Sequence, residues 1–354
     1  MKKITVLGAG STGHAIAADL TLAGFEVTLY EQPGFNEERV ETILTQGGIE
    51  IRGAARQGFA KISRVTTEME EALKDTSVVM VAVLASRHEK IAELCAPYLS
   101  EGQTIVISAG NAGSLIFANK LKEERVTIAE IEGNLYPCRI VAPATVLVAL
   151  PTRTKYVAAF PAKNTERARD ALRGIYDTLP ATNVLEAALN SPNVVIHLAA
   201  SLLNTGAIEQ SGGEYYLYKQ GMTESALRCI EAMNSEKLAL FKALGYVERS
   251  PLELIKKVAK QAEFPELAAF RGLMGPTSMR HRYISEDASM GVSLMVSLGE
   301  MINVAVPMAK ALVTLASVVN QIDYLKEGRT VEKLGIAGST INELNEFLVK
   351  GERG

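Results

Sequence analysis

Three glycines near the start of the chain have the spacing of a nucleotide-binding turn. Gly8, Gly10 and Gly13 form a G-x-G-x-x-G pattern between the apolar run 4–7, typical of a buried parallel strand, and the apolar stretch 14–22, typical of a helix. The start of that helix would offer backbone N–H groups and the positive end of the helix dipole to a phosphate. The sequence therefore predicts a dinucleotide site that includes Gly8, Gly10, Ser11, Thr12 and Gly13.

The type of dinucleotide can be inferred from the residue that follows the next predicted strand, 26–30. Glu31 lies near the spacing expected for an acid that accepts hydrogen bonds from the adenosine ribose. A carboxylate there repels a 2′-phosphate, so NAD is the expected cofactor, although Arg39 could reach a phosphate and leaves NADP possible. Ala85 and Gly110 follow apolar strands, at the strand ends where open sheets bind ligands, and are expected to line the same site.

Three side chains in the second half could perform acid–base chemistry together. His197 lies in an apolar helical stretch, whereas Arg282 and Asp287 precede another. A carboxylate bonded to one ring nitrogen of a histidine fixes its tautomer and raises its pKa, so the other nitrogen can exchange protons near neutral pH. Arg282 could hold a substrate carboxylate as a bidentate fork. Spacing alone leaves the simpler alternatives open, namely a core histidine, a helix cap at Asp287 and a surface cation at Arg282.

The order of predicted elements indicates two domains in this chain of 354 residues. Strands and helices alternate through residues 1–183, which predicts a doubly wound parallel α/β sheet of the Rossmann type. The β-rich runs 145–150 and 155–160 are interpreted as further strands of this sheet, and 165–179 as an amphipathic helix.

Strand signals nearly vanish after residue 184, so residues 184–354 are predicted to form an all-helical domain. The active site is expected in the cleft between the two domains. Helix-type spacing occurs in the segments 187–204, 223–244, 251–262, 287–303 and 307–325.

Composition excludes several classes of protein. A formal charge of −3, spread without long runs, gives no electrostatic reason to bind nucleic acid or an anionic membrane. The apolar stretch 292–319 contains Glu300, Pro307 and Lys310, and therefore predicts buried helices rather than a membrane span.

Three scattered cysteines match no metal spacing and no disulfide framework, and the N-terminus has no signal-peptide pattern, so a cytoplasmic protein without a metal is expected. We expect a homodimer, in which the apolar segments 307–325 and 340–348 could form the contact or could equally be core.

Several motifs in the chain resemble the opine (octopine/nopaline) dehydrogenase family, closest to its bacterial carboxyethyl-norvaline dehydrogenase type. The resemblance covers almost the whole chain and implies a Rossmann-type domain followed by a helical domain. It implies NAD(P)H-dependent coupling of an amino acid or amine to a 2-oxo acid through an imine, and the reverse oxidation. Besides the glycine turn with His14, it rests on the segments 136–139, 191–197, 215–216 with Gly221, 282–291 and 327–335.

The resemblance also assigns site residues. It places the family's catalytic histidine at His197, its partner aspartate at Asp287 and its substrate-carboxylate arginine at Arg282. An acidic residue near the substrate falls at Glu130, and Tyr216 could line the substrate pocket or serve only in packing.

Two alternatives remain open from the sequence. One is a 2-hydroxy acid or ketopantoate-type carbonyl reductase, although such sites typically use a lysine and none lies within the motifs of His197 or Asp287. The other is a dinucleotide-binding sensor without turnover.

Overall fold

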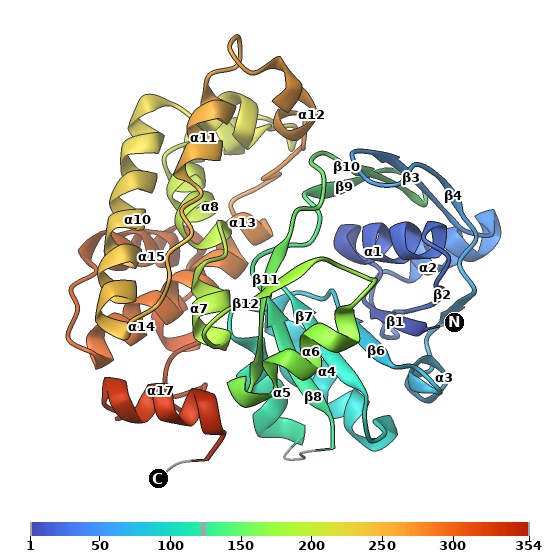
Figure 1. Ribbon diagram of the computed structural model, residues 1–354. Coiled ribbons are helices and arrows are strands. Elements are labelled where there is room, and N and C mark those ends of the chain that lie inside the picture. The colour runs from blue at the N-terminus through green and yellow to red at the C-terminus, as the bar shows by residue number, and fades with distance from the viewer. Residues whose placement is uncertain (1, 122–124, 353–354) are drawn as a thin grey trace. The chain divides into compact units, whose positions relative to one another are not determined.

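The computed structural model describes residues 2–121 and 125–352, which form two compact units with the boundary between Ala187 and Ala188 (Figure 1). The described part of unit 1 contains twelve strands and the helices α1 to α6, and α7 (Val184–Leu189) spans the boundary. No helix in the described ranges is long and apolar enough to cross a membrane.

The main sheet of unit 1 has eight strands in the order β12-β11-β8-β7-β6-β1-β2-β5. Its strands are β1 (Lys3–Leu7), β2 (Glu26–Tyr30), β5 (Arg64–Thr66), β6 (Val78–Val81), β7 (Thr104–Ser108), β8 (Thr127–Ile131), β11 (Lys155–Phe160) and β12 (Thr178–Pro180). Six of these strands, from β8 to β5 in the sheet order, are parallel, and β1 pairs with both β2 and β6. The strand order reverses at β1, so the turn that follows it lies at the switch point where such sheets bind ligands. The predicted doubly wound sheet is confirmed, with the addition that β11 is antiparallel to β8.

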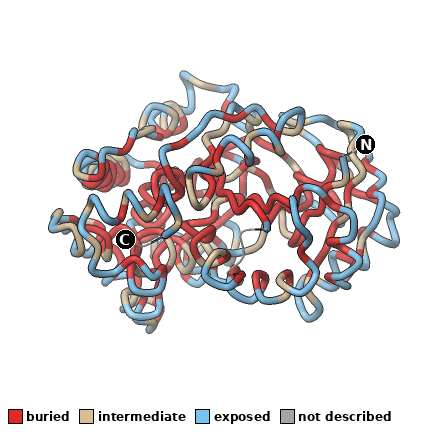
Figure 2. The backbone as a smooth tube through the Cα atoms, turned by 60° about the horizontal axis from the view of Figure 1, so that its bottom comes forward, coloured by how far each residue is buried: buried red, intermediate tan, exposed pale blue. Residues whose placement is uncertain are grey.

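The core of unit 1 lies on both faces of this sheet. Val78 and Met80 of β6 pack with α1 (Ser11–Leu22) and α6 (Thr165–Leu172), whereas Val79 and Val81 pack on the opposite face. The helices on that opposite face are α3 (Met69–Leu73), α4 (His88–Cys95) and α5 (Gly113–Leu121). Because both faces are covered, every residue of β6, β7 and β8 is buried, and Figure 2 shows long buried runs of the backbone inside the molecule.

A second sheet corrects one prediction. Residues 145–150 were expected to extend the main sheet, but β10 (Thr145–Val148) pairs with β3 (Ile49–Gly53) and β9 (Cys138–Ala142) in a separate sheet of order β4-β3-β10-β9. Strand β4 (Gly58–Ala60) completes it, and α2 (Glu37–Gln46) precedes it in the chain. All four strands contact α1, which is therefore buried between two sheets. Its residues Ala15 to Ala18 are all 0% exposed.

Two helix predictions were too long. The helix expected over 165–179 ends at Leu172, because Gly174 adopts a φ of +80° and the chain then forms β12. The helix expected over 187–204 is divided at Pro192, which separates α7 from α8 (Asn193–Leu202).

Unit 2 is helical apart from one isolated bridge between Tyr216 and Gly275 in its described residues, as predicted. Two of its segments, η4 (Leu217–Gly221) and η6 (Asp287–Val292), are π-helical. The remaining elements are α9 (Thr205–Gln210), α10 (Glu224–Leu244), α11 (Leu252–Ala259), α12 (Ala268–Arg271), α13 (Arg282–Glu286), α14 (Ser293–Met301), α15 (Pro307–Asn320), α16 (Tyr324–Glu327) and α17 (Ile341–Lys350).

Candidate active site

The glycine turn of unit 1 has three glycines with different roles. Gly8 has a φ of +109°, and a Cβ on it would lie 2.8 Å from the carbonyl oxygen of Ala82. A Cβ on Gly13 would lie 1.7 Å from the carbonyl oxygen of Gly8, so the helix and the turn approach each other too closely for any side chain. A Cβ on Gly10 would meet no atom within 4 Å. The open space at Gly10 is what a ligand held against the backbone requires.

The first turn of α1 fits an anionic group. Its N-cap is Gly10, which supplies no side-chain oxygen to the helix N–H groups, so these need another acceptor. The side chains of Ser11 and Thr12 contact neighbouring segments, since Ser11 Oγ accepts from Ile140 N at 3.2 Å and Thr12 Oγ1 lies 3.0 Å from Asn134 Nδ2. The turn thus fits a dinucleotide pyrophosphate through its backbone.

Glu31 lies at the edge of this turn and is 1% exposed. Its carboxylate accepts hydrogen bonds from Ala9 N at 2.8 Å, from Gln32 N at 3.0 Å and from Asn36 Nδ2 at 2.7 Å. It also pairs with the guanidinium of Arg87 at 3.4 Å. The predicted ribose acid is therefore next to the glycine turn, and a cation that the sequence analysis missed lies beside it.

Arg87 belongs to a short turn, Ala85–Arg87 (η1), that follows β6. Its guanidinium lies 3.6 Å from the centroid of the Phe35 ring, and it donates to Gln32 Oε1 at 2.8 Å. Ala85 is buried at the start of the turn, whereas Arg39 is exposed on α2. Arg87, and not Arg39, is the cation that contacts Glu31.

Glu130, the predicted acidic residue near the substrate, lies beside the turn that begins α5. It is 0% exposed, and its carboxylate accepts from Ala112 N at 2.8 Å and from the hydroxyl of Ser114 at 2.9 Å. A Cβ on Gly110 would lie 2.8 Å from this carboxyl carbon, so Gly110 makes room for Glu130. Glu130 therefore holds the turn that begins α5, and its contact with a substrate stays a prediction.

The predicted meeting of His197 and Asp287 is present in unit 2. Helix α8 packs against α13 and η6, and this packing places His197 Nδ1 2.7 Å from Asp287 Oδ2. The two side chains are 3% and 4% exposed. The imidazole stacks on the ring of Tyr283, with centroids 3.7 Å apart and an interplanar angle of 19°. Hydrogen bond and stacking together fix the orientation of the imidazole.

The second ring nitrogen of His197 contacts a residue that the sequence analysis missed. Tyr218, in η4, places its hydroxyl 2.8 Å from Nε2. Tyr216, the predicted pocket residue, instead directs its hydroxyl to Glu214 Oε1 at 3.3 Å. The three tyrosines of the segment 215–218 were the available signal, and of these Tyr218 lies within the π-helical turn.

Arg282 is the first residue of α13 and is brought close to this pair. Its guanidinium lies 5.1 Å from the ring centroid of Tyr283 and 3.9 Å from Glu286 Oε2, and its side chain is 32% exposed. Burial raises the pKa of Asp287, and the positive charge of Arg282 acts in the opposite direction. The carboxyl of Asp287 and the imidazole of His197 thus form a buried pair beside a partly accessible cation.

Two other groups carry no chemistry of this kind. Burial raises the pKa of the Cys95 thiol to about 12, so this cysteine stays protonated and packs as a small apolar side chain.

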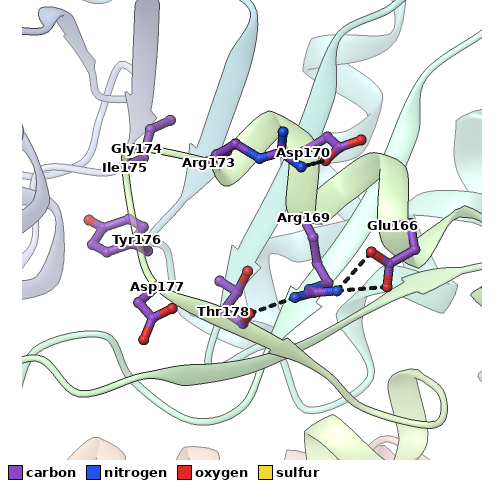
Figure 3. A pocket seen from close by; sticks show the side chains of 9 residues that line it. All are labelled: Glu166, Arg169, Asp170, Arg173, Gly174, Ile175, Tyr176, Asp177 and Thr178. Carbon is purple, nitrogen blue, oxygen red and sulfur yellow. Dashed lines mark hydrogen bonds and ion pairs between the residues drawn. The ribbon is translucent and has the colours of Figure 1, made fainter.

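An open hollow of about 530 Å³ lies between α6 and β12 (Figure 3). Its side chains pair with one another, as Arg169 does with Glu166 at 2.7 Å, and it contains none of the predicted site residues.

Comparison with known proteins identifies the family. The family described as "NAD/NADP octopine/nopaline dehydrogenase, alpha-helical domain" matches residues 180–320. An opine dehydrogenase of Arthrobacter sp. (strain 1C) is 34% identical over 353 residues, which cover 96% of each chain. This chain belongs to the opine dehydrogenase family. It is therefore an NAD(P)-dependent dehydrogenase that acts on a CH–NH bond.

Other comparisons agree with this opine dehydrogenase assignment. The protein ocs of Agrobacterium tumefaciens (strain Ach5) is 26% identical over 97% of this chain and 98% of its own. A solved octopine dehydrogenase with NADH and pyruvate superposes with a TM-score of 0.70 at 17% identity, over 100% of this chain and 99% of that chain, which confirms the fold. The ketopantoate reductase family matches residues 4–125, and these lie within unit 1.

The family decides between the functions left open by the sequence. An opine dehydrogenase joins an amino acid to a 2-oxo acid by NAD(P)H-dependent reduction and catalyses the reverse oxidation, as the resemblance implied. The comparisons favour neither the carbonyl reductase nor the sensor without turnover.

Proposed function

We propose that His197 is the general acid–base of this reductive condensation and that Asp287 fixes its tautomer and charge. The observation that carries the proposal is the 2.7 Å contact between His197 Nδ1 and Asp287 Oδ2 in a buried setting. With Nδ1 committed to Asp287, Nε2 is the nitrogen that exchanges a proton. In the condensation it supplies the proton with which the hydroxyl of the amine–oxo-acid adduct leaves as water.

The nicotinamide cofactor, when bound, supplies the hydride that reduces the imine carbon. We propose that the backbone at Gly8, Gly10, Ser11, Thr12 and Gly13 holds its pyrophosphate, that Glu31 binds its adenosine ribose, and that Ala85 and Gly110 line the rest of its site. Two observations support this assignment: no side chain caps the N-terminus of α1, and the space at Gly10 is open. We further propose a division of roles between the two domains: residues 1–183 bind the cofactor, and residues 184–354 supply the acid–base pair.

A screen of substrates tests the proposed function. Oxidation of NADH would be followed with a panel of amino acids against pyruvate, glyoxylate, oxaloacetate and 2-oxoglutarate, and the products identified by mass. Secondary-amine dicarboxylates are expected, and small aliphatic amino acids are the first candidates because of the resemblance to the carboxyethyl-norvaline type. Oxidation that proceeds without an amine would indicate a carbonyl reductase, and tight NADH binding without turnover would indicate a sensor.

Arg282 is expected to bind the carboxylate of the 2-oxo acid. Arg282→Ala should raise the KM for the oxo acid on the order of 10- to 100-fold, because the substrate carboxylate loses a charged hydrogen-bond donor. The kcat and the affinity for NADH should stay nearly unchanged. Arg282→Lys, which keeps the charge but loses the fork, should lie between. Arg280→Ala is a matched control on an exposed neighbour. A KM unchanged for every oxo acid tested would exclude this role.

Glu31 is expected to make the enzyme prefer NADH. In Glu31→Gln the neutral amide can still accept a hydrogen bond from Ala9 N, but it no longer repels the 2′-phosphate of NADPH. The positive charge of Arg87, which lies beside residue 31, would then attract that phosphate. The ratio of kcat/KM for NADPH to that for NADH should rise about tenfold, equivalent to about 1.4 kcal/mol. Glu38→Gln, exposed on α2, is the control. A clear preference of the wild-type enzyme for NADPH would refute the assignment.

We also propose that the enzyme is a cytoplasmic homodimer. The three free cysteines support a reducing compartment. The exposed apolar side chains of Leu315 and Val318 on α15, which are 49% and 70% exposed, support a contact with a second copy. Light scattering on the purified protein would measure its mass in solution.

A further inference from the structure

We propose that Tyr218 is a further catalytic residue, whose hydroxyl carries the proton between His197 and the substrate. This inference rests on the acid–base role proposed for His197. Asp287 occupies Nδ1 of the imidazole at 2.7 Å, so the proton must travel through Nε2. The Tyr218 hydroxyl lies on that nitrogen, at 2.8 Å. A substrate therefore meets the phenol where it would otherwise meet the imidazole.

The ring of Tyr218 is held in this position from both sides. Its centroid lies 4.3 Å from that of Phe270, and its plane stands at 68° to the ring of Tyr283, with centroids 6.4 Å apart. The residue is only 6% exposed. Turning the phenol away from His197 would break both aromatic contacts, so a hydroxyl that stays in place and relays the proton fits the packing better than one that moves aside.

The backbone beneath Tyr218 is also constrained. Residue 218 lies in the π-helical turn η4, whose first N–H group, on Leu217, donates to the carbonyl of Gly275 at 3.2 Å. Such π-helical turns are frequent at functional sites. Asp287 begins the other π-helical segment described in unit 2, so the two residues described above as hydrogen-bonded to the imidazole nitrogens, Tyr218 and Asp287, both lie on π turns.

The relay conserves protons at each step. In the neutral imidazole, Nδ1–H donates to Asp287 and Nε2 accepts from the Tyr218 hydroxyl. Once Nε2 is protonated it donates to the phenol oxygen, and the phenol proton becomes available to the substrate. As the C–O bond of the amine–oxo-acid adduct breaks, its hydroxyl takes the Tyr218 proton and leaves as water, while the nitrogen lone pair forms the C=N bond. The Nε2 proton moves to Tyr218 in the same step, so the phenol ends neutral and His197 has lost one proton.

The charge of Arg282 places the substrate in the correct region for this step. The guanidinium of Arg282 lies 5.1 Å from the ring centroid of Tyr283, and the ring centroids of Tyr283 and Tyr218 are 6.4 Å apart. An oxo-acid carboxylate bound by its guanidinium would therefore have the adjacent carbon, which carries the departing hydroxyl, near the phenol. The same arrangement serves the oxidation, in which Tyr218 would remove a proton from the attacking water and pass it to Nε2.

Tyr218→Phe tests the relay, because it keeps the ring contacts and removes one oxygen. We expect kcat to fall about 100-fold, within the usual contribution of acid–base catalysis, with the melting temperature and the NADH affinity unchanged. The matched control is Tyr246→Phe, which loses a buried hydroxyl that contacts Asn345 at 3.2 Å and should retain wild-type turnover. A kcat equal to or above wild type in Tyr218→Phe would show that the hydroxyl merely covers Nε2, and would overturn the relay.

A second measurement separates a relay from simple positioning of His197. The measurement is kcat in mixtures of H₂O and D₂O, plotted against the deuterium fraction. In the wild type the plot should be curved, because two protons move in one step. In Tyr218→Phe it should be a straight line. A straight or flat wild-type dependence would overturn the proposal even if Tyr218→Phe is slow. If His197→Ala retains full activity, the proposed acid–base role itself fails. If only Tyr218→Phe retains it, the relay alone fails.

Discussion

His197→Ala is expected to lower kcat by about 10²- to 10⁴-fold in both directions of the reaction, the usual contribution of a general acid–base. The imidazole bridges Asp287 and Tyr218 through its two nitrogens, so its removal takes away the group that supplies and accepts the proton passed through Tyr218. Affinity for NADH, measured by fluorescence titration, should be unchanged. Turnover at the wild-type rate would contradict the assignment.

Asp287→Asn should produce a loss of similar size, because an amide cannot stabilise the imidazolium. Its matched control is Asp323→Asn, in which the lost carboxylate only caps α16 through Lys326 N at 3.1 Å. The control should keep wild-type kcat. An equal loss in both variants would point to a general effect on unit 2 rather than to the acid–base pair.

The pH dependence of the wild type follows from the same pair. Burial raises the pKa of Asp287, so the buried carboxyl–imidazole pair keeps a proton to a higher pH than an exposed carboxylate would. Reduction needs that proton, and its kcat/KM should therefore fall as pH rises through the ionisation of the pair. Oxidation needs the pair without it and should rise over the same range. In His197→Ala both dependences should disappear.

Gly10→Ala is expected to weaken NADH binding on the order of 10- to 100-fold, the effect of losing charged hydrogen bonds to the backbone, while the melting temperature stays the same. The physical reason is that a Cβ at this position meets no protein atom within 4 Å and would enter only the space proposed for the pyrophosphate. Calorimetric titration with NADH and thermal unfolding would measure the two quantities.

Gly13→Ala provides the contrast. Its Cβ would lie 1.7 Å from the Gly8 carbonyl oxygen, so the turn must shift, and we expect a destabilisation of about 1–3 kcal/mol together with weaker binding. The outcome that would contradict the proposed pyrophosphate site concerns the first of these two variants. If Gly10→Ala binds NADH as tightly as the wild type, the turn holds no phosphate.

The strands that one local sequence pattern determines could be predicted from the sequence. The runs at β1, β2, β6 and β7 are apolar because both faces of the sheet are covered, and each was predicted within a few residues. The second sheet was missed because its strands are short, and because the pairing of β10 with β3 joins segments far apart in the chain.

The candidate site shows the same limit. Chemical reasoning paired His197 with Asp287, but their contact depends on the packing of α8 against η6, which no local pattern encodes. Tyr216 was singled out as one of two adjacent aromatic residues, whereas Tyr218 lies two positions further along, inside the π-helical turn, and contacts the histidine. At Glu130 every residue of β8 is buried, so alternation along the strand does not reveal which side chains face a ligand.

The enclosure of α1 between two sheets limits how the coenzyme preference of this enzyme could be redesigned. A surface helix accepts new side chains on its outer face, but α1 has no such face over residues 13–20. Directed evolution that samples these positions would mostly return unfolded protein. Useful variation is confined to residues 32–36 and 86–87, whose exposed and half-buried side chains lie near Glu31 and can be exchanged without disturbing the helix.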